Sequence, residues 1–170
     1  VGVADFGGDF ALERWYNSMG AAKNSMFGRG WAFNWDESLS IAEDGTVLYV
    51  RGDGSVVRFK PDGNGGYTGP AGYDLQLSRE ELEQRTVEFD TDEGLQEQVL
   101  TVYGYSIEAA DGSVRRFNGF GLLSEVEDIL GFVTKLEYDE ATFALKRVVA
   151  PSGLSYDITA DEMGRVAEIL

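Results

Sequence analysis

The chain contains no cysteine and no histidine among its 170 residues. Without cysteine it can form neither a disulfide framework nor a thiolate zinc site, and the redox compartment is left open. Without histidine it lacks the commonest general base near neutral pH, the usual partner of a serine nucleophile and the commonest transition-metal ligand. Most familiar hydrolase mechanisms lose a required part, so we expect that the chain is not an enzyme.

Basic residues are also few. The 14 Lys and Arg against 30 Asp and Glu give a formal net charge of −16. Such a charge repels phosphate backbones and anionic membrane surfaces, which predicts that the chain has no nucleic-acid partner. Solubility is the ordinary explanation of the acidity, and calcium binding is the alternative.

Long apolar runs are absent as well. The longest, residues 47–50, is far shorter than the roughly 20 residues of a membrane-spanning helix. This predicts no membrane insertion, and no signal peptide is visible after Val1. Because the pattern stops midway at residues 166–170, we expect both ends to continue into a longer protein that carries any targeting signals.

Glycine is abundant, with 22 residues, whereas proline is scarce, with 3. Short alternating apolar stretches are separated by Asp-Gly pairs at residues 44–45, 53–54 and 111–112. This is a strong hairpin signal, which we interpret as tight primed turns whose two central residues both have positive φ. Since 43% hydrophobic residues are enough for a core, the predicted fold class is all-β, built from antiparallel hairpins.

Two segments between these turns give more specific predictions. Alternation over residues 99–107 is typical of a strand packed on both sides. In residues 78–85, Ser78 and Glu81 have the spacing of a capping box, which predicts a short helix. The alternative is a strand that runs through this segment into residues 86–89.

The last third of the chain is self-similar. One repeat comprises two strands and two turns and recurs at offsets of 22 and 21 residues. The matching segments are 123–126, 145–148 and 166–169, then Gly131 with Gly153, and 136–139 with 158–161. Because a two-stranded unit is only marginally stable in water, each repeat must pair with the next. We therefore expect the strand at 166–169 to be unpaired and available for intermolecular contact, including self-association.

These repeats resemble the Rhs/YD-repeat family, in which a Tyr-Asp pair and a Gly-Arg-hydrophobic step recur. The matching residues are Gly121, Leu122, Leu123, Val126, Asp128, Gly131, Leu136, Tyr138, Asp139, Leu145, Val148, Pro151, Gly153, Tyr156, Asp157, Gly164, Arg165, Val166 and Ile169. The third copy departs from the pattern, with Ala160-Asp161 in place of Tyr-Asp. Upstream, residues 12–18 and 27–31 resemble the start of the domain that precedes Rhs repeats in bacterial polymorphic toxins.

The resemblance implies two domains: residues 1–120 precede the repeats and include a variable insertion at about 72–98, and residues 121–170 are repeats. It also implies an open, twisted β-spiral sheet that belongs to a hollow shell enclosing a C-terminal toxin or effector. The partners would be the rest of the shell and its cargo, and the location would be secreted or at the cell surface. The alternative is an extracellular adhesin or a carbohydrate- or protein-binding β module, with calcium as a stabilising ligand.

Two acidic loops are weak calcium candidates. The first offers Asp90, Asp92 and Glu93 in a D-x-D-x-G spacing, and residues 62–66 are a weaker version. Neither has the bidentate glutamate of an EF-hand downstream, so we interpret both as solvated acidic turns without a metal. The sequence predicts no other cofactor.

Two further motifs have ordinary structural interpretations. Residues 150–154 resemble the Asp-Pro-x-Gly-Leu motif with which Rhs shells end, but Ala150 replaces the aspartate of its self-cleaving protease. We therefore expect a turn and no self-cleavage near Pro151. Gly28 and Gly30 are followed by a strand pattern and not by the helix of a nucleotide site. The nearby aromatics offer rings for sugar stacking, but core or cross-strand pairing is favoured; they are Trp15, Tyr16, Trp31 and Trp35.

Overall fold

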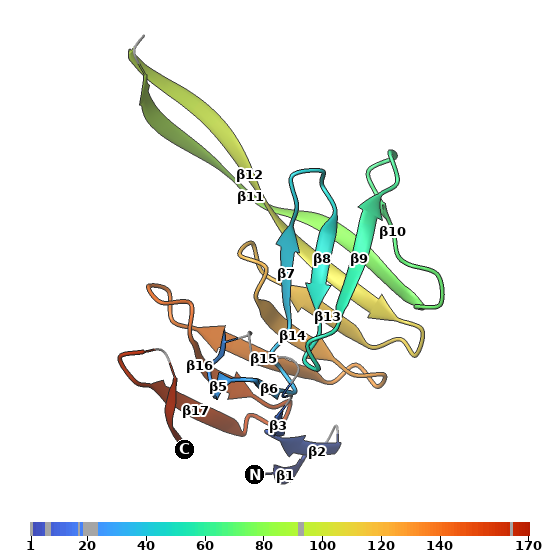
Figure 1. Cartoon of the computed structure of the whole chain (residues 1–170), viewed down its shortest axis with the longest axis vertical. Coiled ribbons are helices and arrows are strands. Elements are labelled where there is room, and N and C mark those ends of the chain that lie inside the picture. The colour runs from blue at the N-terminus through green and yellow to red at the C-terminus, as the bar shows by residue number, and fades with distance from the viewer. Residues whose placement is uncertain (1, 6–7, 17, 19–23, 92–93, 164) are drawn as a thin grey trace.

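The fold is all-β and antiparallel, and its sheets are open (Figure 1). The computed structural model describes residues 2–5, 8–16, 18, 24–91, 94–163 and 165–170. Within these ranges no helix is long and apolar enough to cross a membrane. The predicted fold class is thus confirmed.

The main sheet has eight strands, each hydrogen-bonded to the next in chain order, so it is a simple meander. Its strands are β11 (Leu75–Thr91), β12 (Gly94–Ala109), β13 (Val114–Phe117), β14 (Leu123–Glu127), β15 (Val133–Tyr138), β16 (Leu145–Val149), β17 (Ser155–Ala160) and β18 (Val166–Ile169). The predicted boundary at 120/121 falls in the turn between β13 and β14, inside this sheet. The division into two domains stays a prediction.

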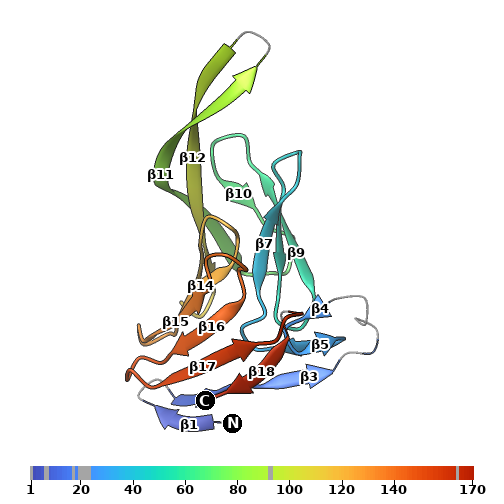
Figure 2. The ribbon, with the colours of Figure 1, turned by 90° about the vertical axis from the view of Figure 1, so that its left-hand side faces the viewer.

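Residues before 75 form a smaller sheet and three short ribbons. The smaller sheet has the order β10-β9-β8-β7 and comprises β7 (Ser38–Ile41), β8 (Val47–Val50), β9 (Val56–Pro61) and β10 (Tyr67–Thr68). The ribbons pair β1 (Gly2–Asp5) with β2 (Gly8–Ala11), β3 (Arg14–Tyr16) with β6 (Trp31–Phe33), and β4 (Asn24–Ser25) with β5 (Gly28–Arg29). Figure 2 shows β7–β10 as a layer facing the main sheet, with β3–β5 beside β17 and β18.

The core lies between the two layers because strand alternation directs one face of each sheet inward. The smaller sheet contributes its inward positions, and the main sheet contributes equivalent positions from successive strands. The largest fully buried side chains are Phe59, Ile107, Leu123, Val47, Val57 and Val148. Burying them supplies the hydrophobic stabilisation that neither sheet has alone.

Residues 78–85 form a strand, so the predicted helix is wrong and the alternative is right. They lie within β11, which pairs with β12 over its whole length. Each capping-box residue has a cross-strand neighbour, with Ser78 opposite Ser106 and Glu81 opposite Tyr103. Pairing with a strong strand satisfies the backbone along the segment, which outweighs a weak local helix signal. The register shifts between Glu81 and Glu83, leaving Leu82 in a β-bulge.

The strand predicted over residues 99–107 is confirmed as part of β12, but only its second half is packed. Ile107 is 1% exposed and Tyr105 is buried, whereas Val99 is 59% exposed. The first half of β12 extends beyond the body of the molecule together with β11 (Figures 1 and 2). Alternation alone therefore identified the strand but not which part of it the fold covers.

The Asp-Gly pairs lie in hairpin turns as predicted, but the turn type differs. Positive φ occurs at Gly45, Gly54 and Gly112 and not at the aspartates that precede them. Each aspartate instead accepts a hydrogen bond from the backbone N–H two residues later. This is a wider loop that ends in a left-handed glycine, so the aspartate is favoured for its carboxylate and not for a positive φ.

The sequence repeat is also a structural repeat. Register shifts recur beside Phe117, Tyr138 and Ala160, where these residues pair with Leu123, Leu145 and Val166 respectively. Leu123 and Leu145 are buried in the core, and Val166 packs against it. Residues separated by the spacing of 22 and then 21 positions thus occupy equivalent positions in successive hairpins.

Candidate functional site

The outer edge of β18 is the first candidate site, because it ends the main sheet. The edge strand was predicted to be unpaired, but its first residue has a partner. Val166 donates its N–H to the Met26 carbonyl oxygen at 2.7 Å, from the turn between β4 and β5. A segment near the N-terminus thus contacts one end of the edge strand, and residues 168–170 continue past that contact.

The ribbon β1–β2 is fixed to the same end of the main sheet. The Tyr156 hydroxyl donates a buried hydrogen bond of 2.9 Å to the Phe10 carbonyl oxygen. The two rings stack with centroids 4.5 Å apart, and Phe10 also lies 5.8 Å from Trp35. Tyr156, one of the two tyrosines of the proposed Tyr-Asp pairs, therefore holds the N-terminal segment against the repeats.

A polar cluster joins the two layers further up the molecule. The Glu37 carboxylate accepts a hydrogen bond of 2.5 Å from the Tyr49 hydroxyl and forms an ion pair with Arg115, whose Nε lies 3.0 Å away. Burial, followed by the neighbouring Glu37 carboxylate, raises the pKa of Tyr49 well above its usual value. The three groups satisfy one another, which identifies the cluster as a connection between β8 and β13 and not as a reactive centre.

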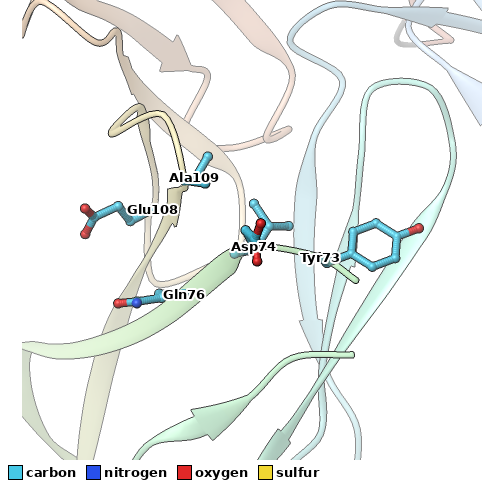
Figure 3. A pocket seen from close by; sticks show the side chains of 7 residues that line it. Tyr73, Asp74, Gln76, Glu108 and Ala109 are labelled. Carbon is cyan, nitrogen blue, oxygen red and sulfur yellow. The ribbon is translucent and has the colours of Figure 1, made fainter. Parts of the chain in front are cut away.

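A shallow recess of about 440 Å³ lies at the start of β11 and the end of β12, away from the part of this hairpin that projects from the body. Figure 3 shows Gln76 and Glu108 side by side, with the Tyr73 ring directed away from them. Gln76 and Glu108 are cross-strand neighbours. Because the polar groups do not converge on one point, the recess does not have the geometry of a catalytic or ligand-binding site.

The acidic turns use their carboxylates to hold their own backbone. Asp62, in the weaker calcium candidate, accepts hydrogen bonds from the N–H groups of Asn64 and Gly66. Asp90 is exposed in β11, and the other two candidates, Asp92 and Glu93, lie outside the described residues. In the described part of the chain, no group of three or more acidic side chains is placed to hold a metal ion.

Three other turns, at Asp44, Asp111 and Asp161, make stability dependent on pH. Hydrogen bonds from the Ser113 backbone and hydroxyl lower the pKa of Asp111. The pKa of Asp44 is lowered mainly by a hydrogen bond from the Thr46 backbone, and that of Asp161 mainly by one from the Arg165 backbone. Because the pKa is lowered in the folded state, the ionised carboxylates stabilise the fold at pH values above the ordinary pKa of 3.8. This contribution is lost as the pH falls through the folded pKa.

We expect the free energy of unfolding, measured with urea, to fall as the pH is lowered from 5 to 3. The variant D44N/D111N/D161N should flatten this dependence, because asparagine accepts the same turn hydrogen bonds without titrating. Asn118 already does so for Phe120 and Leu122. An unchanged pH dependence in the variant would contradict this assignment.

Residues 150–154 form a turn between β16 and β17, as predicted. Gly153 has a φ of +89° and donates its N–H to the Ala150 carbonyl oxygen at 2.9 Å. Ala150 is buried, and its N–H bonds to the Leu154 carbonyl oxygen at 2.8 Å. The expectation that the chain does not cut itself near Pro151 stays a prediction.

The aromatic candidates near the N-terminus pack mostly against protein groups. Trp35 is buried. The Trp31 ring lies 5.6 Å from the Tyr16 ring, and the Arg14 guanidinium lies 4.9 Å from the Trp31 ring. Trp15 is half-buried in β3. Gly28 lies in β5 and Gly30 in the turn that leads into β6, so the strand pattern after them is confirmed. Structural contacts thus involve these rings, although the Tyr16 side chain is still 57% exposed.

The comparisons with known proteins concern the segment that forms the ribbons and the smaller sheet. Residues 4–59 match DUF6531, a domain of unknown function. The DUF6531 segment runs from β1 into β9 and covers about a third of the chain. It contains Phe10, Met26 and Glu37, three residues that contact the main sheet. The search of curated proteins found no match for this chain.

Proposed function

We propose that this chain is a structural, non-catalytic module of an Rhs/YD-type shell that encloses a C-terminal toxin or effector. The observation that carries the proposal is the recurrence of the same hairpin, with the same register shift, at β13–β14, β15–β16 and β17–β18. A unit that returns to the same position can be added again without a change of fold, which is how a long wall is built from repeats.

Two further features support the proposal. The DUF6531 segment precedes the repeats, in the order expected from the resemblance. It packs against the last two strands of the repeats, β17 and β18, through Phe10 and Met26. The partners are then the remaining repeats and the enclosed effector, and the parent protein is secreted or displayed on the cell surface.

The proposal is tested by adding one more repeat. A second copy of residues 150–170 is placed after Leu170, so that its first strand can pair with residues 168–170. Because each interface between repeats adds to stability, we expect the melting temperature to rise by about 3 °C or more. Hydrogen exchange should show protected amides in the added strands.

The matched control is a glycine-serine extension of equal length, which should leave the melting temperature unchanged. If the added repeat stabilises the chain no more than this control does, and its amides exchange as fast, the main sheet does not grow in this direction. The shell proposal would then be wrong.

A further inference from the structure

The hairpin β11–β12 projects beyond every other strand, and we call its outer part the arm, residues 83–90 and 94–101 (Figures 1 and 2). β12 pairs with β13 only from Tyr105 to Glu108, so in the described residues of the arm the strand pairing is between β11 and β12 alone. An isolated two-stranded ribbon is at best marginally stable in water. The arm therefore depends on its own side chains, or on a partner, for further stabilisation.

One face of the arm combines apolar and acidic side chains. Residues directly opposite each other point to the same side, which places the pairs Thr86–Val99, Glu88–Glu97 and Asp90–Leu95 together. We call Glu88, Asp90, Leu95, Glu97 and Val99 the acidic face. Leu95 is 75% exposed and Val99 is 59% exposed.

The acidic face is unfavourable in the free molecule. Glu88 and Glu97 are directly opposite each other, and like charges in this position destabilise a strand pair. Among the described residues, no lysine or arginine forms an ion pair with either carboxylate. A cation placed between them, with apolar groups over Leu95 and Val99, would remove both penalties.

We propose that the acidic face of the arm is a docking site for a basic polypeptide segment of another protein. The surface of that segment that contacts the acidic face has a lysine or arginine at its centre and an apolar side chain on each side of this residue. A second copy of this chain does not fit, because it would bring four carboxylates together in a chain whose net charge is already −16. Nucleic acid and anionic lipid are disfavoured by the same charge.

The proposal is tested with a synthetic peptide in which threonine alternates with valine and lysine in turn. In an extended peptide, valine and lysine then share one face. The reference peptide has glutamate in place of lysine. Both are labelled, and binding to the whole chain is followed by fluorescence anisotropy. We expect the lysine peptide to bind at least about tenfold more tightly than the glutamate peptide.

Two variants of the acidic face should each reduce this binding by about tenfold or more. E88K/E97K reverses the central charges, and L95T/V99T removes the apolar groups while keeping strand-forming residues. The matched controls, E140K/E162K and I129T/L130T, change exposed residues in turns of the main sheet and should bind as the unaltered chain does. Circular dichroism verifies that each variant is folded.

Three results would overturn the proposal. The lysine peptide could fail to bind, or it could bind the two arm variants as tightly as the controls. Sedimentation could instead show that the chain forms a dimer that L95T/V99T dissociates, in which case the occupant is a second copy. A failure of this test would leave the repeat-extension result unaffected, because the extension concerns β18.

Discussion

Replacing Gly121 with alanine is expected to destabilise the chain by about 4 kcal/mol or more, an exceptional value for one methyl group. Gly121 has a φ of +75°, and an added Cβ would lie 2.2 Å from the Leu39 carbonyl oxygen. The Gly121 carbonyl oxygen also accepts the Leu39 N–H at 2.7 Å, next to the bridge between Ser38 and Leu122. The methyl group therefore forces apart the backbone contact that joins the start of β7 to the main sheet.

Gly131 provides the control for this variant. Gly131 has a φ of +83° in a turn of the same kind. The nearest atom to an added Cβ is a carboxylate oxygen of Glu127, 3.9 Å away. G131A should cost only the left-handed backbone strain of about 1–2 kcal/mol. Urea unfolding of both variants measures the difference, and equal losses would show that the contact with Leu39 does not matter.

Replacing Glu37 with alanine should cost about 2–3 kcal/mol, because it leaves Arg115 and the Tyr49 hydroxyl without their shared partner. We place the value below that of a fully buried pair because the Arg115 side chain is 31% exposed. Chemical denaturation measures the loss. The control Y49F removes one hydroxyl and keeps the ion pair, so it should cost about 1 kcal/mol.

A double variant separates the ion pair from simple packing. If Glu37 and Arg115 stabilise the fold through each other, E37A/R115A should cost less than the sum of the two single replacements. Additive losses, or a loss in E37A no larger than that in Y49F, would show that the cluster does not connect the layers in the way its geometry indicates.

Much of the fold could be predicted from the sequence because it is encoded locally. Asp-Gly turns mark the hairpins, and the apolar stretches beside them contain Val47 and Phe59, both of which are fully buried. The repeat spacing likewise predicts equivalent burial of Leu123 and Leu145. These features need only neighbouring residues, so a short stretch of sequence contains all the information.

Other features could not be predicted because they depend on distant residues. The sequence around Ser78 left a helix and a strand both open, and the pairing with β12 that decides between them depends on distant residues such as Ser106. Glu37 and Arg115 are separated by 78 positions, and neither lies in a recognisable motif. A signal was present for some turns: an Asp or Asn three residues before a glycine, as in Asn118 with Gly121, accompanies the observed side-chain hydrogen bonds. The exposure of Val99 follows from where the body of the molecule ends, which periodicity does not report.

The contact between Phe10 and Tyr156 has a consequence for biosynthesis. The hydrogen bond between them spans 146 positions, whereas every strand of the main sheet after β11 pairs with the strand just before it in the chain. As the polypeptide leaves the ribosome, the meander can assemble strand by strand from local pairings. The Phe10 ring, in contrast, has to wait until Tyr156, 146 positions later, has been translated. Phe10 thus finds this native neighbour later than the strands of the main sheet find theirs, and during that interval its segment is exposed to chaperones and proteases.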